Sequence, residues 1–422
     1  MIKKEKVYFK TFGCRTNVFD TQVMMNNLKD FDITLTEKEA DIVVINSCTV
    51  TNSADSTARN YISSLKKLDN DPRVVFTGCG VWTKGESLFK ENKIDALFGH
   101  SEKEKINSLL KDDKRFFEAG DLKHIDETII DKMIGRSRAF IKIQEGCDFR
   151  CSYCIIPFVR GNSRSYDEEK ILNQVSILAS NGFGEFILTG TNVGSFGKEH
   201  GVVNKKDKLT QLIKKMAMIR GVRRIRLGSI EPVQITDEFK EILTEPWMGK
   251  HLHIALQHTN KVMLKIMHRR NKVKSDLELF ELLASKGYAL GTDFIVGHPG
   301  ETDEIWEDAM KNIDQFPLTH IHSFTYSPRD GTPSAQMTPQ INGTIAKARL
   351  RELEAKIQQK NIDFRQENQV LDILIESKKE NIYTGYDQFF NTIEVKSDTN
   401  LVGDWISIKN YEKLENKNAS KF

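Results

Sequence analysis

The sequence predicts an α/β protein built from an N-terminal parallel-sheet domain, a central partial (βα)6 TIM-like barrel and a small C-terminal β-barrel. Strand and helix patterns alternate over residues 1–115 and again over 133–340, which is typical of parallel sheets covered by helices. A long charged helix within 341–367 acts as a linker to short alternating apolar runs at 368–412. The last residues, 413–422, are polar and are expected to fray.

The composition indicates a folded protein of the cell interior. Of its 422 residues, 39% are apolar and 29% are charged, which is enough apolar content to rule out wholesale disorder. Lys and Arg exceed Asp and Glu by 62 to 59, so the net charge of +3 neither indicates nor excludes a nucleic-acid partner. No run approaches the roughly 18 apolar residues that span a bilayer, and the charged N-terminus lacks the apolar stretch of a signal peptide. We expect a soluble cytoplasmic protein without membrane contact.

In the first domain, three apolar strands are expected at 7–12, 41–46 and 73–77, with helices at about 20–28 and 51–68 between them. Each strand is followed by a cysteine: Cys14, Cys48 and Cys79. Because the carboxyl ends of parallel strands lie along one edge, these cysteines could converge in space. The alternative is that they are unrelated small buried side chains.

The central domain shows six candidate strands, at 140–144, 185–189, 224–228, 252–256, 290–296 and 321–326. Helical patterns such as 167–180 and 275–286 lie between them. This alternation favours a partial or full barrel over an open sheet without separating the two. A charged helix is expected at about 344–366, followed by strands at 371–375, 392–395 and 405–408.

The other three of the six cysteines lie in one short loop, Gly146-Cys147-Asp148-Phe149-Arg150-Cys151-Ser152-Tyr153-Cys154. Three close thiolates suit a soft metal or an iron–sulfur cluster. With only three cysteines, one iron of a 4Fe–4S cluster keeps an open position for a substrate or cofactor. Structural zinc is the alternative, and it would need a distant fourth ligand such as His253.

This C-x3-C-x2-C loop, with Tyr153 before its last cysteine, resembles the signature of the radical S-adenosylmethionine (SAM) superfamily. Together with the three upstream cysteines and the downstream β module, it resembles the methylthiotransferases over essentially the whole chain. That family implies a sulfur-donating N-terminal domain, a radical SAM barrel and a C-terminal TRAM domain.

The resemblance implies two 4Fe–4S clusters and SAM as cofactors. Cys147, Cys151 and Cys154 match the ligands of the cluster that binds SAM and generates a 5′-deoxyadenosyl radical. Cys14, Cys48 and Cys79 match the ligands of an auxiliary cluster, whose open iron carries the sulfur to be inserted. SAM is both methyl donor and radical source in this family, and no catalytic residue is implied beyond the cluster ligands.

Three further stretches resemble the SAM-binding edges of the barrel, at 185–192, 226–232 and 293–301. The resemblance assigns cofactor contact to eight residues: Tyr153, Thr189, Gly190, Asn192, Ser229, Glu231, Asp293 and Val296. One stretch departs from the family pattern. Gln257-His258-Thr259-Asn260 stands where Gln-Ser-Gly is usual, which puts the role of this loop in doubt.

Two short motifs bear on the substrate. Gly13-Cys14-Arg15-Thr16-Asn17 and the stretch 160–165 resemble the branch that methylthiolates carbon 2 of N6-threonylcarbamoyladenosine beside the tRNA anticodon. The alternatives are the branches that act on isopentenyladenosine in tRNA or on a ribosomal-protein aspartate. A noncatalytic iron–sulfur RNA-binding protein is a further alternative from a different class.

The implied partners are a tRNA anticodon stem-loop, a reducing electron donor such as a flavodoxin or ferredoxin, and a sulfur source. Basic residues that could contact RNA phosphates fall in two runs, with a solvated helix face as the commoner meaning of such runs. The runs are Lys261, Lys265, His268, Arg269, Arg270, Lys272 and Lys274, and Arg220, Arg223, Arg224 and Arg226. Four aromatic residues of the β module could stack unpaired bases, namely Tyr383, Tyr386, Phe389 and Phe390, although the last two could belong to its core.

Overall fold

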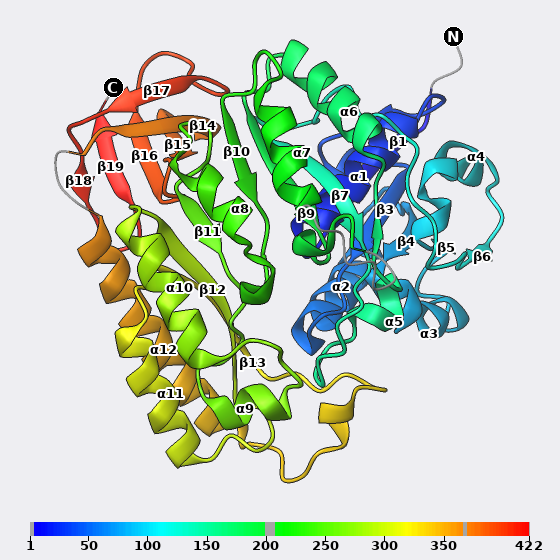
Figure 1. The fold of residues 1–422 in the computed structure, drawn as a ribbon. Coiled ribbons are helices and arrows are strands. Elements are labelled where there is room, and N and C mark those ends of the chain that lie inside the picture. Colours follow the sequence, from blue (N-terminus) through cyan, green and yellow to red (C-terminus); the bar gives the residue numbers. More distant parts are fainter. Residues whose placement is uncertain (1–3, 199–206, 366–368, 422) are drawn as a thin grey trace.

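The computed structural model describes residues 4–198, 207–365 and 369–421, and it confirms the predicted α/β fold class (Figure 1). The N-terminal sheet is entirely parallel, with strand order β2-β1-β3-β4-β5-β6. Its strands are β1 (Lys6–Thr11), β2 (Asp32–Ile33), β3 (Ile42–Ser47), β4 (Arg73–Gly78), β5 (Ala96–Phe98) and β6 (Phe116–Glu118). Its helices are α1 (Arg15–Asn27), α2 (Asn52–Leu65), α3 (Gly85–Lys90) and α4 (Ile106–Lys111).

The first helix differs from the expectation. It begins at Arg15, directly after Cys14, rather than near residue 20. The first turn holds polar and β-branched side chains, which favour a loop when read locally. In the folded protein Thr16, Asn17 and Phe19 are buried, and Thr16 lies against Thr189 of the barrel. Packing between the two domains therefore outweighs local propensity.

The central domain is a partial barrel of six parallel strands. These are β7 (Ala139–Glu145), β9 (Glu185–Gly190), β10 (Arg224–Leu227), β11 (His251–His253), β12 (Ala289–Val296) and β13 (His320–Thr325). Backbone bonds from Ile230 to the His253 carbonyl and from Ala255 to the Ile230 carbonyl join β10 to β11. At the other edge, the short β8 (Arg164–Ser165) pairs antiparallel with β7, and no described pairing links β7 to β13.

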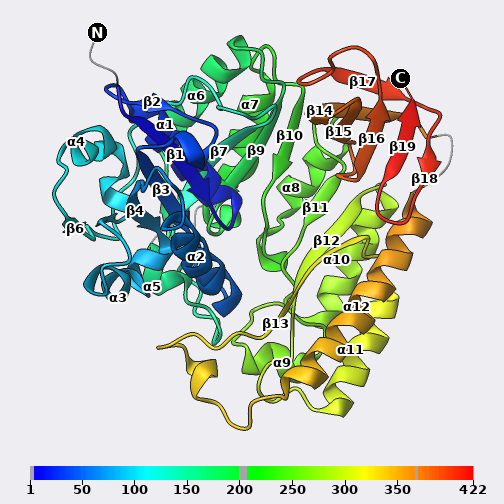
Figure 2. The same ribbon diagram turned by 180° about the vertical axis from the view of Figure 1, so that it is seen from behind.

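Helices cover the outer face of the barrel (Figures 1 and 2). They are α6 (Glu168–Ser180), α7 (Lys208–Ala217), α8 (Asp237–Glu241), α10 (Val273–Ser285), α11 (Asp303–Gln315) and α12 (Gly343–Phe364). The short α5 (Ile156–Arg160) instead packs against the N-terminal domain, and α9 (Lys261–Ile266) lies near the carboxyl ends of the strands. One set of alternate strand positions supplies the apolar core. The other set is polar and includes Lys142, Glu185, Arg226, His253 and Asp293. Among the described helices, none is both long and apolar enough to cross a bilayer.

The C-terminal module is a curled sheet with strand order β17-β14-β15-β16-β19-β18. Its strands are β14 (Leu371–Lys379), β15 (Ile382–Tyr386), β16 (Thr392–Lys396), β17 (Trp405–Ile408), β18 (Glu412–Lys413) and β19 (Asn418–Lys421). The expected fraying after 412 is wrong, because β19 pairs in parallel with β16 and Arg365 donates to the Leu414 and Lys417 carbonyls. Of the expected helix at 344–366, Gln366 lies outside the described residues.

The module is pinned to the barrel by arginines. Arg138 donates to Glu376 at 2.5 and 2.8 Å, and Arg224 donates to Asp372 at 2.7 Å. Arg226 donates to the backbone carbonyl of Asp387. Arg224 and Arg226 are therefore buried structural cations, neither RNA contacts nor a solvated face. This corrects the interpretation of half of the second basic run.

The four aromatic candidates of the module are not free to stack bases either. Tyr383 and Phe389 are buried in the core of the module. Tyr386 and Phe390 stack on each other at 4.9 Å, with the guanidinium of Arg138 over both rings. These rings therefore hold the module on the barrel, which corrects the base-stacking interpretation.

Candidate functional site

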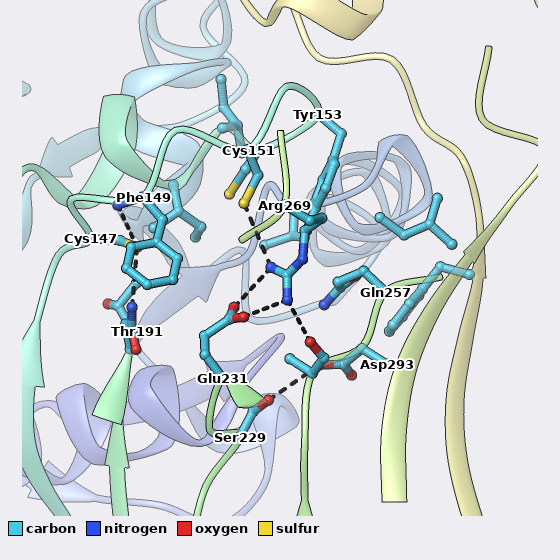
Figure 3. A pocket seen from close by; sticks show the side chains of 18 of the residues that line it. Cys147, Phe149, Cys151, Tyr153, Thr191, Ser229, Glu231, Gln257, Arg269 and Asp293 are labelled. Atoms are coloured by element: carbon cyan, nitrogen blue, oxygen red, sulfur yellow. Dashed lines mark hydrogen bonds and ion pairs between the residues drawn. The ribbon is translucent and has the colours of Figure 1, made fainter. Parts of the chain in front are cut away.

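A cavity of about 330 Å³ lies at the carboxyl ends of the barrel strands, beside the cysteine loop (Figure 3). Cys147, Cys151 and Cys154 all line it. Val50 and Thr51 of the N-terminal domain line it as well, two and three residues after Cys48. The cavity therefore extends from the loop cysteines to the segment that follows Cys48. The carboxyl ends of the strands are where barrel proteins usually carry their active sites.

The cysteine loop is tied down on both sides. Gly146 turns the chain out of β7 with a φ of +72°, where a Cβ would lie 2.0 Å from the Asn162 carbonyl oxygen. Cys147 donates its backbone N–H to the Gly161 carbonyl at 3.0 Å, and Ser152 donates to the Met267 carbonyl at 3.1 Å. The loop is thus held between the end of α5 and the end of α9.

Nitrogen donors point at the sulfur atoms of this loop. The Cys147 sulfur accepts from the Phe149 backbone at 3.4 Å and from the Asn192 amide at 3.7 Å. The Cys151 sulfur accepts from Arg269 at 3.6 Å. Such donors stabilise thiolates and are typical of the surroundings of iron–sulfur clusters.

Burial holds two of the loop cysteines as neutral thiols when no metal is bound. Burial raises the pKa of Cys154 to about 12 and also raises the pKa of Cys147. A nearby metal charge would therefore be needed to hold both as thiolates at neutral pH.

The proposed fourth zinc ligand lies elsewhere. His253 is absent from the cavity lining, and its Nε2 lies 3.0 Å from a carboxylate oxygen of Asp293. Asp293 also lies 3.5 Å from His322 Nδ1 and accepts from the Ser229 hydroxyl at 3.4 Å. Burial by itself would raise the pKa of Asp293, but the two imidazoles hold it well below its usual range. The cavity is therefore lined by an ionised carboxylate that can accept hydrogen bonds from a ligand.

The N-terminal cysteines sit at the carboxyl edge of their sheet. Cys14 precedes α1, Cys48 follows β3, and Cys79 follows β4. The Asn17 amide connects two of these loops, since it donates to the Phe12 carbonyl at 2.8 Å and to the Ser47 carbonyl at 2.9 Å. Burial raises the pKa of Cys79 to about 12, and Arg160 donates to its sulfur at 3.2 Å. The donor set again fits an iron–sulfur cluster.

Gly13 is expected to be essential for this second cysteine group. It has a φ of +94°, and a Cβ would lie 2.5 Å from Cys48 Cβ and 2.9 Å from Cys48 Sγ. Gly13→Ala should therefore displace Cys48 and roughly halve the iron bound after anaerobic reconstitution, from about eight to about four atoms per chain. Gly182→Ala is the matched control, because it has a φ of +95° with nothing within 4 Å. Equal iron content in both variants would contradict the assignment.

The structure brings five of the eight expected cofactor contacts to the cavity: Tyr153, Asn192, Ser229, Glu231 and Asp293. The other three do not line it. The Thr189 hydroxyl lies 3.4 Å from the Thr16 hydroxyl, Gly190 packs against Gln144, and Val296 is buried in the main core. Strand alternation explains Val296, because Asp293 and Ile295 occupy the opposite face of β12.

Arg269 is a cavity residue that sequence reasoning misplaced among the RNA contacts. Its side chain is 2% exposed and forms a two-pronged pair with Glu231. It also donates to the Ala255 carbonyl at 2.5 Å and to the Cys151 sulfur (Figure 3). The sequence did not indicate this position, because Arg269 stands in a basic run and its partners Glu231 and Cys151 are distant in sequence.

Gln257 was expected only as part of a doubtful loop. It lines the cavity with a φ of +67°, and its backbone bonds to β12 at Asp293 and Ile295. The departing His258 is buried, and its Nε2 lies 3.2 Å from Glu301. The unusual His258 is therefore paired inside the fold with a residue outside this loop, while Gln257 lines the cavity.

Comparison with known proteins agrees with this geometry. Residues 6–99 match the uncharacterized protein family UPF0004, and residues 141–313 match the radical SAM superfamily. A Helicobacter pylori protein assigned as a methylthiotransferase is 54% identical, with 99% of this chain and 100% of that protein covered. The threonylcarbamoyladenosine tRNA methylthiotransferase MtaB of Bacillus subtilis is 31% identical, covering 96% of this chain and 93% of its own.

The chain is also similar to a relative from another branch and to a solved structure. The tRNA-2-methylthio-N(6)-dimethylallyladenosine synthase of Staphylococcus haemolyticus is 30% identical over 97% of this chain and 83% of its own. The radical SAM methyltransferase TsrM of Kitasatospora setae shares the fold, with a TM-score of 0.60 at 15% identity over 79% and 77% of the two chains. The cysteine loop, the barrel and full-length similarity to such relatives place this chain in the radical SAM methylthiotransferase family.

Proposed function

We propose that this enzyme methylthiolates carbon 2 of N6-threonylcarbamoyladenosine beside the tRNA anticodon. The observation that carries the chemistry is a cavity that is lined by the three loop cysteines and also by Val50 and Thr51, which follow Cys48. The substrate assignment rests on the motif at 13–17 and on the relatives named as threonylcarbamoyladenosine tRNA methylthiotransferases, which are 31–33% identical to this chain.

The residues divide into two sets of ligands. We assign Cys147, Cys151 and Cys154 to the cluster that binds SAM, and Cys14, Cys48 and Cys79 to the auxiliary cluster. When bound, the two clusters and SAM supply the radical, the sulfur and the methyl group. The chain itself provides an acceptor for SAM polar groups at Asp293, a second carboxylate at Glu231 that is fixed by Arg269, and an aromatic wall at Tyr153.

The partners follow from this assignment. We propose a tRNA anticodon stem-loop as substrate, a flavodoxin or ferredoxin as electron donor and a separate sulfur source, all in the cytoplasm. The isopentenyladenosine and ribosomal-protein branches remain the rival substrates. A noncatalytic RNA-binding role is disfavoured by a cavity lined by three cysteines and an ionised carboxylate.

Mass spectrometry of tRNA nucleosides from a strain that lacks this gene tests the proposal. We expect unmodified N6-threonylcarbamoyladenosine to accumulate, its 2-methylthio derivative to disappear, and the wild-type gene to restore the derivative. Loss of the methylthio group from isopentenyladenosine instead would assign the enzyme to that branch. If both nucleosides were unchanged and a ribosomal protein lost its modification, the substrate would be a protein.

A further inference from the structure

Arg160 belongs to the barrel domain but reaches into the cysteine site of the N-terminal domain. It is the last residue of α5, and its side chain is 2% exposed. Its Nε donates to the Cys79 sulfur at 3.2 Å. Arg160 and Cys79 are 81 positions apart in the sequence and belong to different domains. The contact therefore forms only because the two domains pack against each other.

The other donors of Arg160 extend the contact to the remaining cysteine loops. One Nη2 hydrogen bond goes to the Asn17 side-chain oxygen at 2.5 Å. The amide of the same Asn17 holds the carbonyls of Phe12 and Ser47, which lie just before Cys14 and Cys48. Arg160 and Asn17 together therefore connect all three cysteine-bearing loops.

Arg160 is itself fixed by buried acids from both domains. Its Nη1 donates to Asp20 at 2.9 Å and to Glu145 at 3.0 and 3.1 Å. Lys142 bonds to the same two carboxylates, so this network spans the domain boundary. Because a guanidinium offers donors in a rigid planar fork, it can serve the sulfur, the amide and both acids at once, which a lysine cannot.

The second cysteine group contains a counterpart. Arg269 donates to Cys151 at 3.6 Å and is fixed by Glu231. Each group of cysteines therefore has one buried arginine aimed at one of its sulfurs. This pairing supplies a natural control, since the two arginines address different sites.

We propose that Arg160 is a positioning residue of the auxiliary cluster, which holds Cys79 in place and raises the reduction potential of the cluster through its hydrogen bond to sulfur. The inference rests on the proposed function, which assigns Cys14, Cys48 and Cys79 as the ligands. Hydrogen bonds to cluster sulfurs are an established means of setting such potentials. The barrel domain would in this way tune the site from which sulfur is delivered.

The test uses the full chain with Cys147, Cys151 and Cys154 replaced by alanine, so that only the auxiliary cluster remains. The protein is grown with arginine that carries 15N only in its guanidinium group, so that the backbone nitrogen of Arg15 beside Cys14 is not labelled. It is reduced with dithionite, and pulsed electron paramagnetic resonance then detects 15N coupled to the cluster. We expect a 15N coupling that persists in Arg269→Lys and disappears in Arg160→Lys. Redox titration should show a more negative midpoint potential for Arg160→Lys and no change for Arg269→Lys.

A bound cluster without any 15N coupling would overturn the inference, and this measurement needs no substitution at Arg160. An unchanged midpoint potential in a folded Arg160→Lys variant would overturn it as well. Complete absence of iron from the protein that retains Cys14, Cys48 and Cys79 would instead contradict the proposed ligand assignment.

Discussion

Replacing Cys14, Cys48 and Cys79 together with alanine is expected to abolish methylthiolation while reductive SAM cleavage continues. These cysteines lie at the edge of the N-terminal sheet, whereas Cys147, Cys151 and Cys154 lie on a barrel loop that is held by its own contacts. The variant should keep about four of about eight irons per chain. Product should fall at least about 100-fold, which corresponds to roughly 2.7 kcal/mol or more in transition-state stabilisation.

The converse variant is the control. Alanine at Cys147, Cys151 and Cys154 should also keep about four irons per chain, yet lose both SAM cleavage and product. The measurements are iron content, 5′-deoxyadenosine release and nucleoside mass spectrometry on the same preparations. Normal product from the first variant would show that sulfur does not come from the N-terminal site.

The long apolar strands were predictable because their pattern is local, whereas short strands such as β5 and β6 were not predicted. All six residues of β3, Ile42–Ser47, are buried, and such an apolar run between turn residues is typical of a central parallel strand. The loop cysteines were equally accessible to sequence reasoning, since their spacing within eight positions already dictates a shared site.

The arginines were not predictable, because charge alone does not reveal burial. Arg226 and Arg269 stand in basic runs, but each pairs with a glutamate about 40 positions away, Glu185 and Glu231. Only the folded chain brings these partners together. Similarly, the polar residues of β19 show no pattern typical of a strand. This strand is held in place by backbone pairing with β16 and by the hydrogen bond from Arg365 to the Lys417 carbonyl.

Deleting residues 369–422 is expected to destabilise the barrel as well as to weaken tRNA binding. The deletion removes Glu376 from Arg138 and Asp372 from Arg224, and it uncovers the buried Arg226. Because the deletion also exposes these arginines to water, the cost is that of the lost hydrogen bonds between charged groups, about 1.5–3 kcal/mol each. We therefore expect the unfolding temperature to drop by roughly 10 °C or more in a calorimetric scan.

A surface variant separates the two effects of this module. Lys378, Lys379 and Lys396 are exposed, and Lys379 and Lys396 flank Ile382 across three adjacent strands. Replacing the three lysines with alanine touches none of the buried arginine contacts. We expect an unchanged unfolding temperature and weaker tRNA binding. The slope of the logarithm of the binding constant against the logarithm of the salt concentration should be less steep by up to about 2–3, because each lost phosphate contact removes about 0.7–0.9 from it.

The comparison of the two variants decides what the module does. If the deletion left the unfolding temperature unchanged, the arginine contacts would not stabilise the barrel, and the module would be an independent appendage. If the lysine variant bound tRNA with full affinity and an unchanged slope, these lysines would not contact RNA. Both expected results together would mean that one small sheet both packs against the barrel and holds tRNA through these lysines. A loss of activity on truncation could then not by itself be assigned to RNA binding.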